Sequence, residues 1–124
     1  MGTYEASIER SFRASHAVRM PDGSFEPPHE HLWNVTAVFQ SQRLEPTMGV
    51  VVDFVDAGAA LEAIMAELEG GDLNRLDEFA GTGPSAEKVA QYLAQRLSAR
   101  MAGVARLYKV SVTEAPGCVA AFYP

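Results

Sequence analysis

Histidine is the residue type in this chain with the clearest chemical potential, because imidazole binds metal ions and exchanges protons near neutral pH. The 124 residues contain three histidines, His16, His29 and His31. His29 and His31 are two positions apart, the spacing that points both side chains to one face of a β-strand. Such a pair can share one metal ion, and His16 can join it if the two strands concerned pair. Each histidine can otherwise be an ordinary half-buried residue, but the common face of all three favours a metal site.

The ligand types also indicate which ion and which kind of site to expect. Three neutral imidazoles leave a tetrahedral position open and the charge of a divalent ion uncompensated, a pattern typical of catalytic sites. We therefore expect Zn2+ as the cofactor, bound by His16, His29 and His31.

Glu114 is the second residue whose position is unusual. It continues the apolar side of a predicted strand, after Val110 and Val112. A carboxylate on that side is costly to bury unless it meets hydrogen-bond donors. Two parallel hydrogen bonds to the N–H pair of a flat heterocycle would satisfy it. The alternative is an exposed strand end just before the turn at Pro116 and Gly117.

The elements that carry these residues follow from hydrophobic periodicity. Alternating apolar and polar residues predict four strands, and apolar residues at helical spacing predict two helices between the second and third strands. The predicted strands are residues 3–13, 29–41, 106–114 and 119–123. The predicted helices begin at the caps Asp53 and Ser85 and end at Gly70-Gly71 and Gly103, with the apolar stripes Phe54, Ala57, Leu61, Ile64, Leu68 and Val89, Leu93, Leu97, Met101.

This order, ββααββ, predicts an α+β fold. Residues 1–124 are expected to form a single domain, in which both helices cover one face of a four-stranded antiparallel sheet. The two open sheet edges favour oligomerisation by edge pairing.

Composition excludes several classes of function. The net charge of −6 and the ten scattered Lys and Arg residues argue against nucleic acid and against anionic membranes as partners. No apolar run approaches the length of a membrane span, and one cysteine forms no internal disulfide. We therefore expect a cytoplasmic protein in which Cys118 packs as a small hydrophobic residue.

Five segments, in this order, resemble the 6-pyruvoyltetrahydropterin synthase / 6-carboxytetrahydropterin synthase family. They are FRASH ending at His16, HEH at 29–31, GVVVDF at 49–54, GPSAE at 83–87 and VTE ending at Glu114. The resemblance implies the tunnelling fold (T-fold), assembled by edge pairing into trimers that stack as a homohexamer. It assigns His16, His29 and His31 to catalytic zinc, and Glu114 to the pterin ring of a small-molecule substrate.

The catalytic relay of the family is altered in this sequence. Family members usually carry a cysteine four residues before the HxH pair, where this chain has Phe25. Their LDHHxLN segment appears here as LEGGDLN, so that Glu69 replaces the aspartate and Gly70 the catalytic histidine. Glu69 is the weaker of two candidate catalytic residues.

Glu26 is the other candidate, because EPPHEH resembles the ExxHGH motif of a variant group that uses glutamate in place of cysteine. That group cleaves the side chain of 7,8-dihydroneopterin triphosphate. The leading hypothesis is a zinc-dependent pterin-processing carbon–oxygen or carbon–carbon lyase with an altered proton relay and Glu26 as base. The alternative is a zinc-containing homologue that binds a pterin or purine-like ligand without the synthase activity, with Glu26 a solvated loop residue.

Overall fold

The computed structural model describes residues 2–81 and 83–124, and the elements follow the predicted order. The strands are β1 (Tyr4–His16), β2 (His29–Ser41), β3 (Leu107–Ala115) and β4 (Cys118–Phe122), and the helices are α1 (Phe54–Ala66) and α2 (Ala86–Arg100). Two short 3-10 helices, η1 (Leu73–Arg75) and η2 (Asp77–Phe79), lie in the loop between α1 and α2. The predicted α+β class is confirmed.

One antiparallel sheet with the strand order β1-β2-β3-β4 forms the base of the molecule. β1 extends three residues beyond the predicted strand and ends at His16, which pairs directly with His29 at the start of β2. β1 and β4 form the two edges of the sheet. The register therefore brings the ends of β1 and β2 that carry histidine to the same end of the sheet.

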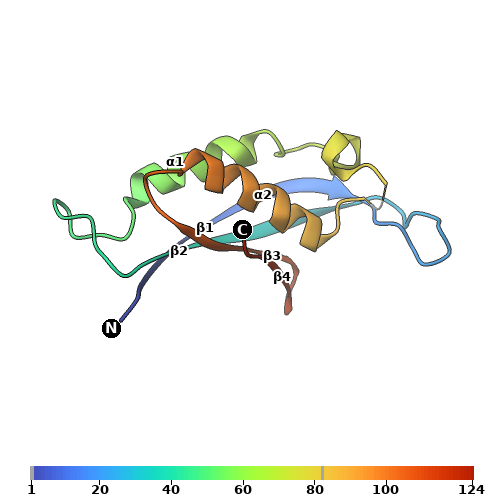
Figure 1. Ribbon diagram of the computed structural model, residues 1–124. Helices are drawn as coiled ribbons and strands as arrows, with labels where there is room; N and C mark the ends of the chain where they lie inside the picture. The colour runs from blue at the N-terminus through green and yellow to red at the C-terminus, as the bar shows by residue number, and fades with distance from the viewer. Residues whose placement is uncertain (1, 82) are drawn as a thin grey trace.

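Both helices cover the same face of this sheet (Figure 1), α1 against β1 and α2 against β3 and β4. The buried face includes Phe12 and Trp33, whose rings stack with centroids 6.0 Å apart. The indole Nε1 of Trp33 donates to the carbonyl of Ala14 at 3.1 Å. Trp33 is fully buried beside His16 and His31, so the core extends directly to the histidines.

The predicted helix caps are confirmed. The Asp53 carboxylate accepts from the N–H of Val55 at 2.8 Å, and the Ser85 hydroxyl oxygen accepts from the N–H of Lys88 at 3.2 Å. Each such cap stabilises a helix by about 1 kcal/mol. The Ser85 cap also fixes the chain just before α2, where Pro84 contacts a histidine.

Three details of packing differ from the sequence prediction. Phe54, placed on the buried stripe, is the first residue of α1 and is 55% exposed, so the stripe begins at Ala57. Leu68 is buried as expected but lies beyond the end of the helix. Cys118 is exposed, because it begins the edge strand β4 directly after the turn.

No helix within residues 2–81 and 83–124 has the length and apolar content to cross a membrane.

Candidate metal centre

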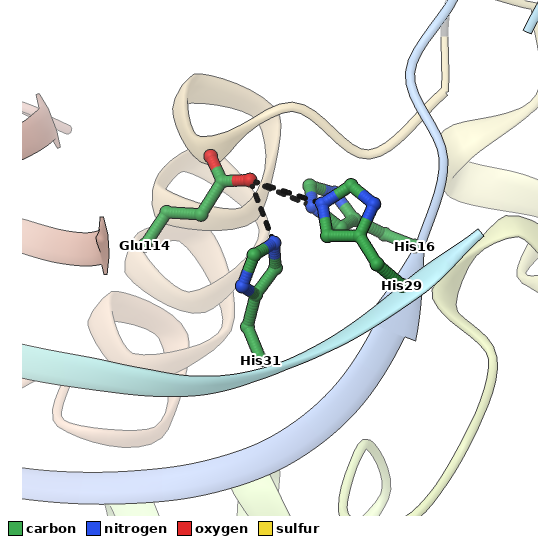
Figure 2. Close-up of side chains that lie close together, drawn as sticks. All are labelled: His16, His29, His31 and Glu114. Atoms are coloured by element: carbon green, nitrogen blue, oxygen red, sulfur yellow. Dashed lines mark ion pairs between the residues drawn. The ribbon is translucent and has the colours of Figure 1, made fainter. Parts of the chain in front are cut away.

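The three histidines form one cluster at an end of the sheet (Figure 2). His16 on β1 and His29 on β2 are cross-strand partners, and His31 lies two residues along β2 on the same face. Their ring centroids are 4.2 to 5.0 Å apart. The structure therefore brings together the three residues that the sequence predicted as metal ligands.

Two backbone carbonyls orient the imidazoles. Nδ1 of His16 lies 2.7 Å from the carbonyl oxygen of Pro84, and Nδ1 of His29 lies 3.1 Å from that of Pro27. A carbonyl oxygen only accepts, so each Nδ1 carries the proton and each Nε2 of the neutral ring keeps its lone pair for a metal ion. Nε2 of His16 and of His31 are buried and have no hydrogen-bond partner. Unpartnered buried nitrogen atoms are rare, and these two fit the role of metal ligands.

Glu114, at the end of β3, completes the cluster. Its Oε1 lies 2.7 Å from Nε2 of His16, 3.1 Å from that of His31 and 3.8 Å from that of His29. The contact with His16 is short but lacks hydrogen-bond geometry. Because the carboxylate and the free Nε2 atoms are all acceptors, they repel one another unless a cation lies among them. Ligand atoms of the four residues lie within 4.8 Å of one another, so the set fits a single metal ion.

His31 is held in the form that binds metal. Burial lowers the pKa of His31 below its ordinary value of 6.5, and the charge of nearby His29 lowers it further, while the Glu114 carboxylate raises it. The net direction is downward, so the imidazole of His31 is neutral at physiological pH. A neutral imidazole binds a metal ion without first releasing a proton.

Glu26 lies at the border of the cluster. The loop between β1 and β2 is closed by two hydrogen bonds, from the N–H of Glu26 to the carbonyl of Val18 and from the N–H of Val18 to Oε1 of Glu26. The same Oε1 is 3.9 Å from Nε2 of His29. Phe25, in the position of the family's cysteine, is 49% exposed. The structure thus places a carboxylate beside the histidines.

Glu69 is not brought to the histidines. Its side chain accepts a hydrogen bond from the backbone N–H of Arg13 at 2.8 Å, and the N–H of Gly70 donates to the carbonyl of Arg13 at 2.7 Å. The segment around Glu69 therefore attaches to the backbone of β1. In this position the carboxylate links the loop to the sheet.

The comparisons with known proteins agree with this geometry. The family model described as 6-pyruvoyl tetrahydropterin synthase matches residues 5–124. The chain belongs to this family. Among curated proteins, a dihydroneopterin monophosphate aldolase of Pyrococcus furiosus is 26% identical over 104 residues, which cover 84% of this chain and 83% of that protein.

Solved structures of the 6-pyruvoyl tetrahydropterin synthase family share the fold. The synthase of Caenorhabditis elegans has a TM-score of 0.87 at 20% identity, covering 100% of this chain and 97% of that one. A Plasmodium vivax synthase, described as a mutant in which alanine replaces a catalytic glutamate, has a TM-score of 0.80 at 15% identity and covers 100% and 99%. The predicted T-fold is confirmed.

The groups that hold the histidines were not predicted from the sequence. The carbonyls of Pro27 and Pro84 leave no side-chain signal in a sequence. Asn74 was also missed, although its amide bridges both backbone groups of Ala17, directly after His16, at 2.8 and 2.7 Å. The match of LEGGDLN to the family segment was the one signal that pointed to Asn74.

Proposed function

We propose that the protein is a zinc-dependent pterin-processing lyase that cleaves the side chain of a phosphorylated dihydroneopterin. The observation that carries the proposal is the position of Glu26, whose carboxylate lies 3.9 Å from Nε2 of a histidine in the metal cluster. That position combines a proton acceptor with a metal site, as a lyase acting on a diol requires.

Zinc is the proposed ion because imidazole nitrogen is a ligand that it prefers, and three imidazoles lie together here. His16, His29 and His31 would hold it through Nε2, the atoms that the carbonyls of Pro84 and Pro27 leave unprotonated in two of the rings. When bound, zinc would supply Lewis-acid polarisation of an oxygen atom in the substrate side chain.

Glu26 would act as the base of the reaction. Its carboxylate is 26% exposed, so it is partly desolvated and still open to a substrate. It would take the proton of a side-chain hydroxyl, which becomes a carbonyl as the adjacent carbon–carbon bond breaks. The electron pair passes to the carbon attached to the pterin ring, which takes up a proton. The hydrogen bond from the N–H of Val18 holds Glu26 in place for this transfer.

The proposed substrate class rests on the relatives. The Pyrococcus furiosus relative is an aldolase for dihydroneopterin monophosphate, and the Plasmodium vivax synthase carries a glutamate described as catalytic. Glu114 would accept two hydrogen bonds from the N–H pair of the pterin ring. Both the monophosphate and the triphosphate of 7,8-dihydroneopterin are therefore substrates to test.

The alternative function is a zinc-containing protein that binds pterins or purine-like molecules without turnover. It is favoured by Gly70, which stands where the family carries its catalytic histidine, and by Glu69, which is bonded to the backbone of β1. Under this alternative, the protein would bind the heterocycle through Glu114 and release it unchanged.

A homohexamer, formed as a dimer of trimers, is the proposed assembly. β1 and β4 leave unpaired backbone groups at the two edges of one sheet, and pairing β4 of one chain with β1 of the next would satisfy both. Light scattering coupled to size-exclusion chromatography should give six times the 13.4 kDa chain mass.

The decisive experiment is incubation of the zinc-loaded protein with each dihydroneopterin phosphate, followed by chromatography of the products. We expect 6-hydroxymethyl-7,8-dihydropterin, loss of turnover in Glu26→Gln, and pterin affinity that stays close to wild type. Glu30→Gln is the matched control, because Glu30 is in the same motif but is exposed on the opposite face of β2, 4.0 Å from Arg13. Pterin binding without any product would support the binding protein, and equal turnover in all three forms would exclude Glu26 as the base.

A further inference from the structure

β1 is an edge strand, and its histidine end needs support from outside the sheet. In an antiparallel pair, alternate residues direct their N–H and C=O groups away from the neighbouring strand. Toward the end of β1 these residues are Arg13, Ser15 and Ala17. His16 and His29 form the last pair of the β1–β2 ladder, so Ala17 lies beyond it. The end of β1 that carries a proposed metal ligand would therefore fray unless another segment holds it.

Residues 69–74, in the connection between α1 and α2, lie along this edge. Gly70 donates its N–H to the carbonyl of Arg13 at 2.7 Å. Ser15 donates its N–H to the carbonyl of Gly71 at 2.9 Å. The segment thus pairs with the outer side of β1 through its own backbone, as a short additional strand would.

Two side chains of the segment extend this pairing in both directions. Oε2 of Glu69 accepts from the N–H of Arg13 at 2.8 Å. Oδ1 of Asn74 accepts from the N–H of Ala17 at 2.8 Å, and Nδ2 of Asn74 donates to the carbonyl of Ala17 at 2.7 Å. Ala17 is buried, so its backbone groups could not turn to water if the Asn74 amide were lost.

Asn74 is itself held in place. Its N–H donates to Oδ1 of Asp72 at 3.0 Å, and its neighbour Leu73 is buried in the core. The same connection continues to Pro84, whose carbonyl contacts Nδ1 of His16. One connection therefore holds both the backbone beside His16 and its imidazole, whereas the other two histidines belong to β2.

We propose that residues 69–74 act as a splint on β1, in which Asn74 and Glu69 are positioning residues for the metal ligand His16. The role rests on the proposed function for its metal ion, while its test needs no pterin. A small displacement of β1 would change the distances from Nε2 of His16 to the Nε2 atoms of the other histidines. The segment that replaces the family's catalytic relay would thus serve the metal site instead.

Cobalt substitution tests this role, because the visible bands of Co2+ report the arrangement of its ligands. We would load wild type, Asn74→Ala and Ile64→Val with Co2+, record the spectra, and measure zinc affinity by competition with a chelator, well below the Tm of each form. Ile64→Val is the matched control, since it destabilises the core from α1 without removing a contact of the splint. Loss of groups that orient ligands weakens metal binding by about 10–100-fold. We expect at least about a tenfold loss and a changed spectrum for Asn74→Ala, and less than about a twofold loss for Ile64→Val.

Glu69 provides a second and milder test, which also serves if Asn74→Ala does not fold. Glu69→Gln keeps an oxygen that can accept from the N–H of Arg13, whereas Glu69→Ala removes it. Arg13 is three residues from His16, so we expect a smaller loss of zinc affinity for Glu69→Ala, about threefold, and recovery in Glu69→Gln.

The outcomes separate this role from the proposed function. Zinc affinities and cobalt spectra like those of wild type in Asn74→Ala and Glu69→Ala would overturn the positioning role, as would an equal loss in Ile64→Val. Equal losses in Glu69→Gln and Glu69→Ala would overturn the part assigned to the hydrogen bond of Glu69. If the variants behave as expected but no dihydroneopterin phosphate is cleaved, the proposed lyase fails and the splint stands. A wild-type protein that binds no Co2+ would overturn both.

Discussion

Gly83 offers a sharp test of how the backbone orients the metal site. It has a φ of +88°, and a Cβ at this position would lie 2.9 Å from the carbonyl oxygen of Ala17. The next residue, Pro84, provides the carbonyl that binds Nδ1 of His16. Gly83→Ala should therefore strain the backbone and displace the group that orients His16. Gly81 is the matched control, because its φ is +93° but a Cβ there would meet nothing within 4 Å.

The two substitutions should differ in size. An alanine at positive φ costs about 1–2 kcal/mol at either position, and the contact with a backbone oxygen adds about 1–3 kcal/mol at Gly83 alone. For a chain of this length 1 kcal/mol shifts Tm by roughly 4 °C, so Gly81→Ala should lower Tm by about 4–8 °C and Gly83→Ala by about 8–20 °C. Zinc affinity, measured by chelator competition, should fall about tenfold or more only in Gly83→Ala.

Thermal unfolding followed by circular dichroism, on metal-free protein at one fixed concentration, measures the stability difference. Equal Tm losses in the two variants would show that the contact of the new Cβ at position 83 with the Ala17 carbonyl oxygen costs little stability. A Gly83→Ala protein with wild-type zinc affinity would refute the role assigned to the Pro84 carbonyl.

Three further predictions concern other parts of the molecule. Asn74→Ala removes both hydrogen bonds to Ala17 and should lower the free energy of unfolding by about 1–3 kcal/mol, measured by urea denaturation. In the wild-type background, Gly58→Ala should leave the free energy of unfolding nearly unchanged, because the new Cβ would lie 2.5 Å from the Arg10 guanidinium and displace it. In an Arg10→Met background, the same change should raise the free energy of unfolding by about 1 kcal/mol through helix propensity. Burial raises the pKa of Tyr92, so the folded chain keeps this phenolic proton where the unfolded chain has lost it. Stability should therefore fall as the pH rises above about 10, and less steeply in Tyr92→Phe, as measured by urea denaturation across the alkaline range.

The fold could be predicted from the sequence because each element has a local signal. Alternation defines the strands, and the caps Asp53 and Ser85 define where the helices begin. Three histidines on the apolar sides of two strands predicted a common face, and the register of β1 with β2 places His16 opposite His29. The prediction that Cys118 packs as a small hydrophobic residue was wrong, because alternation alone does not show which side of an edge strand a helix covers.

The parts of the site that could not be predicted depend on contacts between distant segments. Glu26 reaches His29 only because the loop is closed by Val18, a pairing that no periodicity encodes.

Glu114 shows the limit most clearly, because its position on the apolar side of a strand identified a carboxylate that needs a partner, but not which one. Both a heterocycle and a metal ion satisfy a buried carboxylate, and a sequence pattern cannot separate them. The structure places Oε1 of Glu114 2.7, 3.1 and 3.8 Å from the Nε2 atoms of His16, His31 and His29. This contact joins three strands, because it depends on the register of β1 with β2 and of β2 with β3. No single segment of the sequence encodes such a register, so the sequence identified the residue and the structure its neighbours.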